Sequence, residues 1–386
     1  MKRKPGIWKG RTTMEKIAIL GAGNGGHAVA ADLGRQGYET SIYSRSAATL
    51  EALTARGGVA YTGCFGEGFS PIKTITPNIE EAIDGARIII ITVPTIALTW
   101  YAHLLAPYLN ESHTVMLNPG HTGGGLHFVQ TLREAGNAKE VRTCETITLT
   151  YGCRIRGPAL VWIPLAMTNL RLAAFPGKHL DALFPTIHTL FPNVVPGTNV
   201  LETGLTDLNA MEHPPGMLLN AAWIEHTKGN FRFYFDGVSP AVARVIQGMD
   251  DERMRILRAL NERAGLDMRV MSFIEYFYEA GLTSRAALES GDMYQALQES
   301  EPNKPIQAPD SLDHRYVNED VGFGLVPMVE IGRWVGIECP TTEALVRLAC
   351  VMMKRDYWHE GLTLAKMGVD QVPVERVGEF LWEGHL

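Results

Sequence analysis

The sequence has few cysteines and no long apolar run, and these absences exclude several classes of protein. Its 386 residues include five cysteines, an odd number, and none forms a C-x-x-C pair. This argues against a disulfide framework or a zinc site and indicates reduced thiols, as in the cytoplasm. No apolar stretch reaches the roughly 20 residues needed to cross a membrane. The longest, residues 86–94, has the length and β-branched content of a buried parallel strand.

Basic clusters, repeats and low-complexity segments are also missing. The net charge is −7, and no basic cluster occurs in the part expected to fold, which argues against nucleic acid or an anionic membrane as a partner. The histidines share no metal-ligand spacing, so we expect no metal. Residues 1–13 are basic but lack the apolar core of a secretory signal. We expect residues 1–14 to be an N-terminal arm, or to precede the natural start.

A glycine-rich turn near the N-terminus is an informative motif. The apolar residues 17–20 lead into Gly21, Gly23, Asn24, Gly25 and Gly26, and small residues follow. This order predicts a strand, a turn and a helix, and that context favours a dinucleotide site over a purely structural turn. In the G-x-G-x-x-G spacing the first glycine permits the turn, the second lets the backbone approach a pyrophosphate, and the third allows close helix packing. The amide N–H groups at the helix start would hold the phosphates.

The residues after the second expected strand, 39–43, bear on which dinucleotide is bound. An NAD-binding chain usually has Asp or Glu there, to accept hydrogen bonds from the ribose hydroxyls. This chain has Ser44, Arg45 and Ser46 instead. The guanidinium and the two hydroxyls offer hydrogen-bond donors to a 2′-phosphate. NADP is therefore favoured and NAD stays open, since Arg45 could also be a solvated loop charge.

Two further strands are expected to end beside the same crevice, because ligands of open α/β sheets lie beyond the carboxyl ends of the strands. These strands cover residues 88–93 and 114–117. We expect the cofactor to contact the residues at their ends, namely Val93, Pro94, Asn118 and Pro119. Asn118 and Thr122 should lie near the nicotinamide and the substrate, although an ordinary turn at the sheet edge is the alternative.

Length and patterning indicate a globular enzyme of two domains. Hydrophobic residues make up 46% and charged residues 20% of the chain, which is ordinary for this class. Apolar strands alternate with amphipathic stretches up to about residue 197, and helical periodicity dominates afterwards, as in residues 241–265, 286–299 and 342–356. We predict an α/β Rossmann-type dinucleotide-binding domain over residues 15–197 and a mostly α-helical domain, carrying substrate and catalytic residues, over residues 198–386.

The helical half contains a candidate for proton transfer. His213 lies in a helical stretch interrupted by Pro214 and Pro215, where a kink would present the imidazole toward a cleft. A lone histidine is more often structural, so this assignment depends on support from other parts of the chain.

Four motifs resemble the octopine/nopaline dehydrogenase family, the opine dehydrogenases. They are G-A-G-N-G-G-H-A at residues 21–28, L-N-P-G-H-T-G-G at 117–124, L-T-D-L-N-A-M-E-H-P at 205–214 and R-Y-V-N-E-D-V-G-F-G-L-V-P at 315–327. The resemblance runs from the first strand almost to the C-terminus. It implies an NAD(P)H-dependent reductive condensation, in which an amino acid joins a 2-oxo acid such as pyruvate and the imine is reduced to a secondary amine dicarboxylate, together with the reverse oxidation.

The resemblance also implies roles for residues in these motifs. His213 and Asp320 match a histidine and aspartate pair that moves protons. A carboxylate bonded to one ring nitrogen fixes the tautomer and raises the basicity of the other nitrogen. Arg315 matches a residue that contacts the substrate carboxylate, which suits a bidentate guanidinium. The alternative for Arg315 is a structural ion pair with Asp313 or Glu319.

The expected partners are an amino acid and a 2-oxo acid, whose identities the sequence does not specify, and a homodimer is left open. Glu145 is a weaker candidate for holding the amino group of the amino acid. Two alternatives keep the fold: a 2-oxo acid or ketopantoate-type reductase, which generally uses a lysine proton donor, and a non-catalytic NADP-sensing protein. The joint presence of His213, Arg315 and Asp320 favours the opine dehydrogenase.

Overall fold

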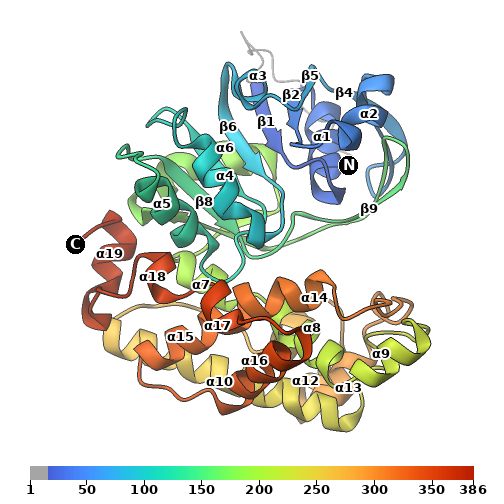
Figure 1. Cartoon of the computed structure of the whole chain (residues 1–386), viewed down its shortest axis with the longest axis vertical. Coiled ribbons are helices and arrows are strands. Elements are labelled where there is room, and N and C mark those ends of the chain that lie inside the picture. The colour runs from blue at the N-terminus through green and yellow to red at the C-terminus, as the bar shows by residue number, and fades with distance from the viewer. Residues whose placement is uncertain (1–15) are drawn as a thin grey trace, which may run out of the picture.

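The computed structural model describes residues 16–386 and has an α/β domain packed on a helical domain (Figure 1). The strands lie between residues 16 and 196, and the helices of the second domain begin at residue 200. This agrees with the predicted fold class. The expected N-terminal arm, residues 1–14, lies outside the described residues.

An eight-stranded sheet forms the centre of the first domain. Its strands are β1 (Lys16–Leu20), β2 (Glu39–Tyr43), β5 (Thr74–Thr76), β6 (Ala86–Ile91), β7 (Thr114–Leu117), β8 (Arg142–Thr146), β11 (Leu170–Phe175) and β12 (Val194–Pro196). They lie in the order β12-β11-β8-β7-β6-β1-β2-β5. Neighbours are parallel, except that β11 is antiparallel to β8. The sheet is therefore parallel except at this one pair.

Helices cover both faces of the sheet, because alternate residues of each strand point to opposite sides. Ile17 and Ile19 pack on the side that holds α1 (Asn24–Arg35), α2 (Ala47–Arg56) and α6 (Leu180–Leu190). Ala18 and Leu20 pack on the other side, which holds α3 (Ile79–Ile83), α4 (Leu98–Leu105) and α5 (Gly124–Glu134). Burial on both faces explains why the central strands are apolar at almost every position.

A second sheet of four strands stands beside α1. It consists of β3 (Gly58–Gly63), β4 (Gly68–Pro71), β9 (Tyr151–Gly157) and β10 (Leu160–Ala166), in the order β4-β3-β10-β9. The sequence predicted short strands in residues 141–176 without assigning their order. The N–H of Ile155 in β9 donates to Asn24 Oδ1 at 2.7 Å. The second sheet therefore holds residues 151–155 against the glycine turn.

The second domain contains α7 to α19 and short connecting turns. The helices are α7 (Val200–Leu205), α8 (Asn209–Leu218), α9 (Ala221–Thr227), α10 (Pro240–Ala264), α11 (Phe273–Glu279), α12 (Arg285–Ser290), α13 (Met293–Gln298), α14 (Arg315–Asn318), α15 (Val326–Trp334), α16 (Pro340–Met353), α17 (Tyr357–Glu360), α18 (Leu364–Met367) and α19 (Val377–Glu383). A π-helical turn, Val321–Leu325, joins α14 to α15. Within the described part of the chain, no helix is long and apolar enough to cross a bilayer.

Local capping sets the ends of these helices. The Ser239 side chain accepts the N–H of Val242 at the start of α10, and Gly265 ends that helix in the left-handed region, with φ of 64°. The single helix expected over residues 286–299 is two helices. Gly291 ends α12 with φ of 67°, and the Asp292 side chain caps α13, so the apolar periodicity continues across a break in the helix.

The C-terminal helices return to the first domain, where α18 packs against α5. Phe380 of α19 lies 5.4 Å, centre to centre, from the ring of Phe175 in β11. Figure 1 shows α18 and α19 beneath α5 at one side of the molecule. The two domains are thus joined at the chain crossover near residue 197 and again at the C-terminus.

Candidate active site between the domains

The glycine turn follows β1, and its geometry explains two of its glycines. Gly21 has φ of 110°, and a Cβ there would lie 2.7 Å from Val93 Cγ1. A Cβ at Gly26 would lie 1.8 Å from the carbonyl oxygen of Gly21, so α1 could not stay against the turn. No atom of residues 16–386 lies within 4 Å of a Cβ built at Gly23. Open space therefore remains where the backbone of α1 begins, which fits a pyrophosphate group.

A cavity of about 420 Å³ lies over this turn. Its wall is formed by the carboxyl ends of β1, β6 and β7, as expected for an open α/β sheet. The predicted cofactor residues that line it are Gly23, Asn24, Gly25, Val93, Pro94, Asn118 and Pro119. Asn118 is fully buried and fixed by Thr150, since its Nδ2 donates to the Thr150 hydroxyl and its Oδ1 accepts the Thr150 N–H, each at 2.9 Å.

Ser44, Arg45 and Ser46 follow β2 and do not line this cavity. Arg45 and Ser46 are exposed. The Arg45 guanidinium lies 5.5 Å from the ring centre of Trp100. It has no ion pair with a described residue within 4 Å, so its hydrogen-bond donors are free to meet a ligand beyond the end of β2.

A second cavity of about 330 Å³ adjoins the first and reaches into the helical domain. Seven residues line both cavities, namely Thr148, Leu149, Tyr151, Gly152, Arg154, Asn209 and Arg315. Helix α8 presents Asn209, Glu212 and His213 to the second cavity, at the i, i+3 and i+4 positions that share one helix face. A ligand in the second cavity would therefore lie next to one held at the glycine turn.

His213 and Asp320 meet although 107 positions separate them. The distance from His213 Nδ1 to Asp320 Oδ2 is 2.6 Å, and the distance from His213 Nε2 to the Tyr234 hydroxyl is 2.7 Å. The Tyr316 ring stacks on the imidazole with centres 3.6 Å apart. Helix α8 continues through Pro214 and Pro215 without a break, and His213 reaches the cavity from the helix face that it shares with Asn209 and Glu212.

Burial controls the protonation of this pair. His213 and Asp320 are each 2% exposed. Loss of water lowers the pKa of His213 well below its usual 6.5 and raises the pKa of Asp320 well above its usual 3.8. Burial therefore disfavours the state in which His213 is an imidazolium and Asp320 a carboxylate. The two groups share a proton across the short contact, and either of them can carry it. The pair is suited to moving a proton toward the cavity.

The position of Arg315 is compatible with both roles considered from the sequence. Its Nη1 lies 3.5 Å from Glu319 Oε2, and its side chain remains 47% exposed and lines both cavities. The ion pair with Glu319 therefore exists, while Asp313 instead accepts a hydrogen bond from Asn318. The guanidinium is oriented by Glu319 and still open to an anionic ligand.

Thr122 and Glu145 line neither cavity. The Thr122 hydroxyl donates to the Gly204 carbonyl at 3.2 Å. Glu145 is fully buried and accepts hydrogen bonds from the Gly125 N–H at 2.8 Å and from the Thr203 hydroxyl. Both side chains bond to α7, so the structure places them at the domain junction and not beside the second cavity.

His121 is a residue of this region to which the sequence assigned no role. Its Nδ1 lies 3.1 Å from Asp207 Oδ2 and its Nε2 lies 3.5 Å from Glu319 Oε1. Burial opposes the charge, but Asp207 and Glu319 outweigh it and raise the pKa of His121 to about 9. An imidazolium from the first domain thus bridges two acids of the second. The motif L-N-P-G-H-T-G-G was the signal that could have drawn attention to His121. Its ion pairs could not be predicted from the sequence, because Asp207 and Glu319 are remote from it along the chain.

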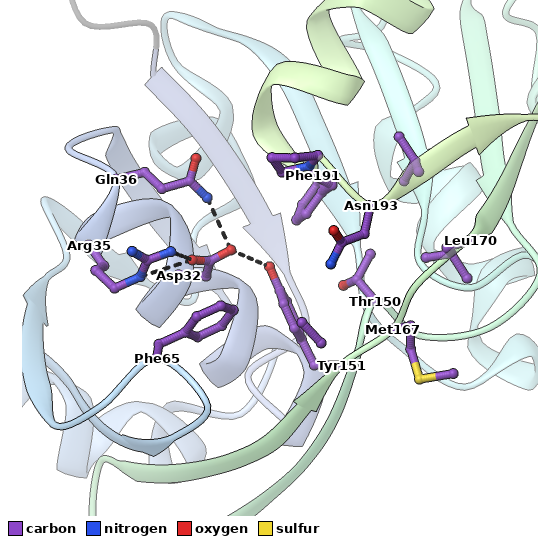
Figure 2. A pocket seen from close by; sticks show the side chains of 13 residues that line it. Asp32, Arg35, Gln36, Phe65, Thr150, Tyr151, Met167, Leu170, Phe191 and Asn193 are labelled. Atoms are coloured by element: carbon purple, nitrogen blue, oxygen red, sulfur yellow. Dashed lines mark hydrogen bonds and ion pairs between the residues drawn. The ribbon is translucent and has the colours of Figure 1, made fainter. Parts of the chain in front are cut away.

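A third cavity, of about 340 Å³, lies on the other side of Tyr151 (Figure 2). The Tyr151 hydroxyl donates to Asp32 Oδ2 at 2.7 Å, and Arg35 and Gln36 also donate to Asp32. Figure 2 shows these donors converging on the Asp32 carboxylate. This network holds the Tyr151 side chain in place. Tyr151 lines the third cavity as well as the other two.

Known proteins resemble both halves of this arrangement. Residues 196–353 match the family described as NAD/NADP octopine/nopaline dehydrogenase, alpha-helical domain, and residues 16–140 match the family described as NAD-dependent glycerol-3-phosphate dehydrogenase N-terminus. An opine dehydrogenase of Arthrobacter sp. (strain 1C) is 34% identical over 352 residues, which cover 91% of this chain and 94% of that protein. The chain belongs to the opine dehydrogenase family.

Solved structures of opine dehydrogenases share the fold. Octopine dehydrogenase with NADH and L-arginine aligns with a TM-score of 0.77 at 21% identity, over 94% of this chain and 98% of that chain. Yersinopine dehydrogenase with NADP+ bound aligns with a TM-score of 0.73 at 16% identity, over 97% and 99%. The family and fold class predicted from the motifs are confirmed. This opine dehydrogenase family member is an oxidoreductase that uses a nicotinamide dinucleotide.

Proposed function

We propose that the protein catalyses the NAD(P)H-dependent condensation of an amino acid with a 2-oxo acid to a secondary amine dicarboxylate, and the reverse oxidation. It would thus act on CH–NH donors. The observation that carries this proposal is the buried pair of His213 and Asp320, 2.6 Å apart, at the wall of a cavity that adjoins the glycine-turn cavity. Family membership and the opine dehydrogenase relatives support the same reaction.

The residues divide the work between binding and proton transfer. Arg315 binds the carboxylate of the 2-oxo acid through its planar guanidinium. When the amine has added to the oxo carbon, His213 supplies the proton that lets the hydroxyl leave as water, with the Tyr234 hydroxyl 2.7 Å from Nε2 as the neighbouring carrier. Asp320 orients the ring from behind, through Nδ1. A bound nicotinamide cofactor supplies the hydride that reduces the imine carbon.

We propose NADP as the preferred cofactor, and the cytoplasm as the compartment. Arg45 is exposed beyond β2, lies over Trp100, and is flanked by two serines instead of an acidic residue. A guanidinium in this position matches a 2′-phosphate. All five cysteines are free, which fits a reducing compartment.

The test follows NADPH absorbance with pyruvate and other 2-oxo acids against a panel of amino acids. We expect oxidation only when both partners are present. Oxidation with the 2-oxo acid alone would favour the ketopantoate-type reductase, although neither cavity is lined by a lysine among the described residues. NADPH binding without turnover under any pairing would favour the sensing protein and contradict the proposal.

A further inference from the structure

Glu212 is an acid of the substrate cavity that the steps above do not use. It precedes His213 on α8 and lines the same cavity. Its Oε2 is buried and has no hydrogen-bond partner among residues 16–386. A buried carboxylate oxygen without a donor is unfavourable, so a ligand that brings N–H groups would satisfy it.

The other acids near this site already have partners. Asp320 is bonded to His213, and Asp207 is bonded to His121 and accepts the Asn209 N–H at 3.2 Å. Glu319 accepts the Thr95 N–H at 2.7 Å and lies beside Arg315 and His121. Glu319 Oε2 also has no hydrogen bond among the described residues, but it lies 3.5 Å from Arg315 Nη1 and Glu319 does not line this cavity. Among these acids, Glu212 is therefore the one that lines the cavity with an oxygen that has neither a hydrogen bond nor an ion pair.

The groups around Glu212 favour a cationic ligand. Asp320 and Asp207 act on it electrostatically, and it in turn acts on the phenols of Tyr234 and Tyr276. Burial, followed by the two acids, raises the pKa of Glu212 to about 8. An ammonium group offers three N–H donors and a positive charge in one small group. Arg315 and Arg154 line the same cavity and can meet carboxylates, which leaves Glu212 for the amino group.

We propose that the Glu212 carboxylate binds the α-ammonium group of the amino acid substrate and removes one of its protons. This inference rests on the proposed function and assigns to Glu212 the role that the sequence gave, with less support, to Glu145. The N–H bond breaks, its electron pair stays on nitrogen, and Glu212 becomes the neutral acid. The nitrogen then attacks the oxo carbon, forming the C–N bond while the C=O π electrons move to oxygen. Nothing is oxidised or reduced in this step.

The acid strength of the two groups supports the transfer. A carboxylic acid whose pKa lies near that of an ammonium group exchanges a proton with it at little cost. A carboxylate with an ordinary pKa near 4 would be a far weaker base. The buried environment of Glu212 therefore has a direct use in making the amine nucleophilic.

The experiment compares Glu212→Gln with wild type and with Glu225→Gln, a control on the exposed face of α9. We expect kcat/KM for the amino acid to fall about 100-fold near pH 8 in Glu212→Gln, where the Glu212 side chain is about half ionised and can act as a base. The loss should be smaller below pH 8, where Glu212 of the wild type is itself protonated, and should shrink again at high pH, because an amine that is already free needs no base. The dissociation constant of NADPH and the KM for the 2-oxo acid should stay within about twofold.

A loss that is equal at every pH, or no loss at all, would overturn the proposal for Glu212 while leaving the reaction itself intact. A wild-type protein that never requires both substrates would overturn the proposed function as well. If Glu212→Gln fails to bind NADPH, Glu212→Asp replaces it. That variant keeps a carboxylate but withdraws it by one methylene from the cavity. We therefore expect a raised KM for the amino acid and a pH profile of unchanged shape. An unchanged KM would contradict the assignment.

Discussion

The imidazole of His213 is held on three sides, by Asp320 at Nδ1, by the Tyr234 hydroxyl at Nε2 and by the stacked ring of Tyr316. Such support fixes both the tautomer and the orientation of the ring before any ligand binds. The same three contacts bury the ring, and burial keeps it mainly neutral at neutral pH. A neutral imidazole in contact with a protonatable acid can both accept and return a proton.

Replacing this ring should separate chemistry from cofactor binding. In His213→Asn we expect kcat to fall at least about 100-fold, because the proton carrier is lost. The affinity for NADPH should be unchanged, since the glycine turn lies in the other domain. Steady-state kinetics and a fluorescence titration with NADPH measure the two quantities. A parallel loss of NADPH affinity would contradict the proposed role.

Arg45 is the residue on which the cofactor preference depends. In Arg45→Asp we expect the affinity for NADPH to fall about tenfold or more relative to that for NADH, since a 2′-phosphate would then face a carboxylate. The ratio of the two dissociation constants is the readout. An unchanged ratio would leave no basis for choosing NADP, and the position would be an ordinary exposed loop charge.

At the scale of elements, the turn between β1 and α1 forms the dinucleotide site. The start of α1 packs on the turn only because Gly26 lacks a Cβ, whereas Gly23 faces open space. The second sheet adds a clamp through the bond from Ile155 to Asn24. Two glycines three positions apart in one motif therefore serve different purposes, one for packing and one for the ligand.

This difference gives a matched pair of variants. Gly26→Ala should lower the free energy of unfolding by about 1–3 kcal/mol, because its Cβ overlaps the Gly21 carbonyl. Gly23→Ala should leave the unfolding free energy nearly unchanged but weaken NADPH binding, since its methyl enters the pyrophosphate space. Urea unfolding and NADPH titration of both proteins test this. Equal effects of the two substitutions on stability would refute the distinction.

At the scale of the whole molecule, a charged cluster fastens one domain to the other. His121 follows β7, Asp207 precedes α8 and Glu319 follows α14, and the three side chains meet at the junction. Arg315 extends the cluster through Glu319 toward both cavities. The placement of Arg315 thus depends on how the domains are docked.

The cluster predicts a pH dependence of stability. The pKa of His121 rises from 6.5 to about 9 on folding, so its contribution, roughly 3 kcal/mol, is fully present below pH 6.5 and is lost as the pH passes 9. We expect the unfolding free energy of wild type to exceed that of His121→Gln at pH 6.5, and the difference to vanish above about pH 9. Urea unfolding across this range is the measurement. A difference that does not change with pH would show that His121 is uncharged in the fold.

The sequence by itself determined what depends on neighbouring residues. The glycine turn, strand β7 and the long helix α10 were predicted from local patterns, because backbone conformation, capping and apolar periodicity act within a few residues. Even there, the break at Gly291 was missed, since periodicity alone does not reveal a change of helix axis.

The family motifs in the sequence also indicated which residues of the helical domain to examine. Only the tertiary structure decided how those residues combine. It brought Asp320 to His213, set Glu145 at the domain junction, left Glu212 Oε2 without a hydrogen-bond partner among residues 16–386 and gave His121 two acidic partners. It also paired β3 with β10, about a hundred residues later. Long-range contacts of this kind depend on how whole elements pack, and burial then sets the charge of each group. Neither effect is encoded in any short stretch of the chain.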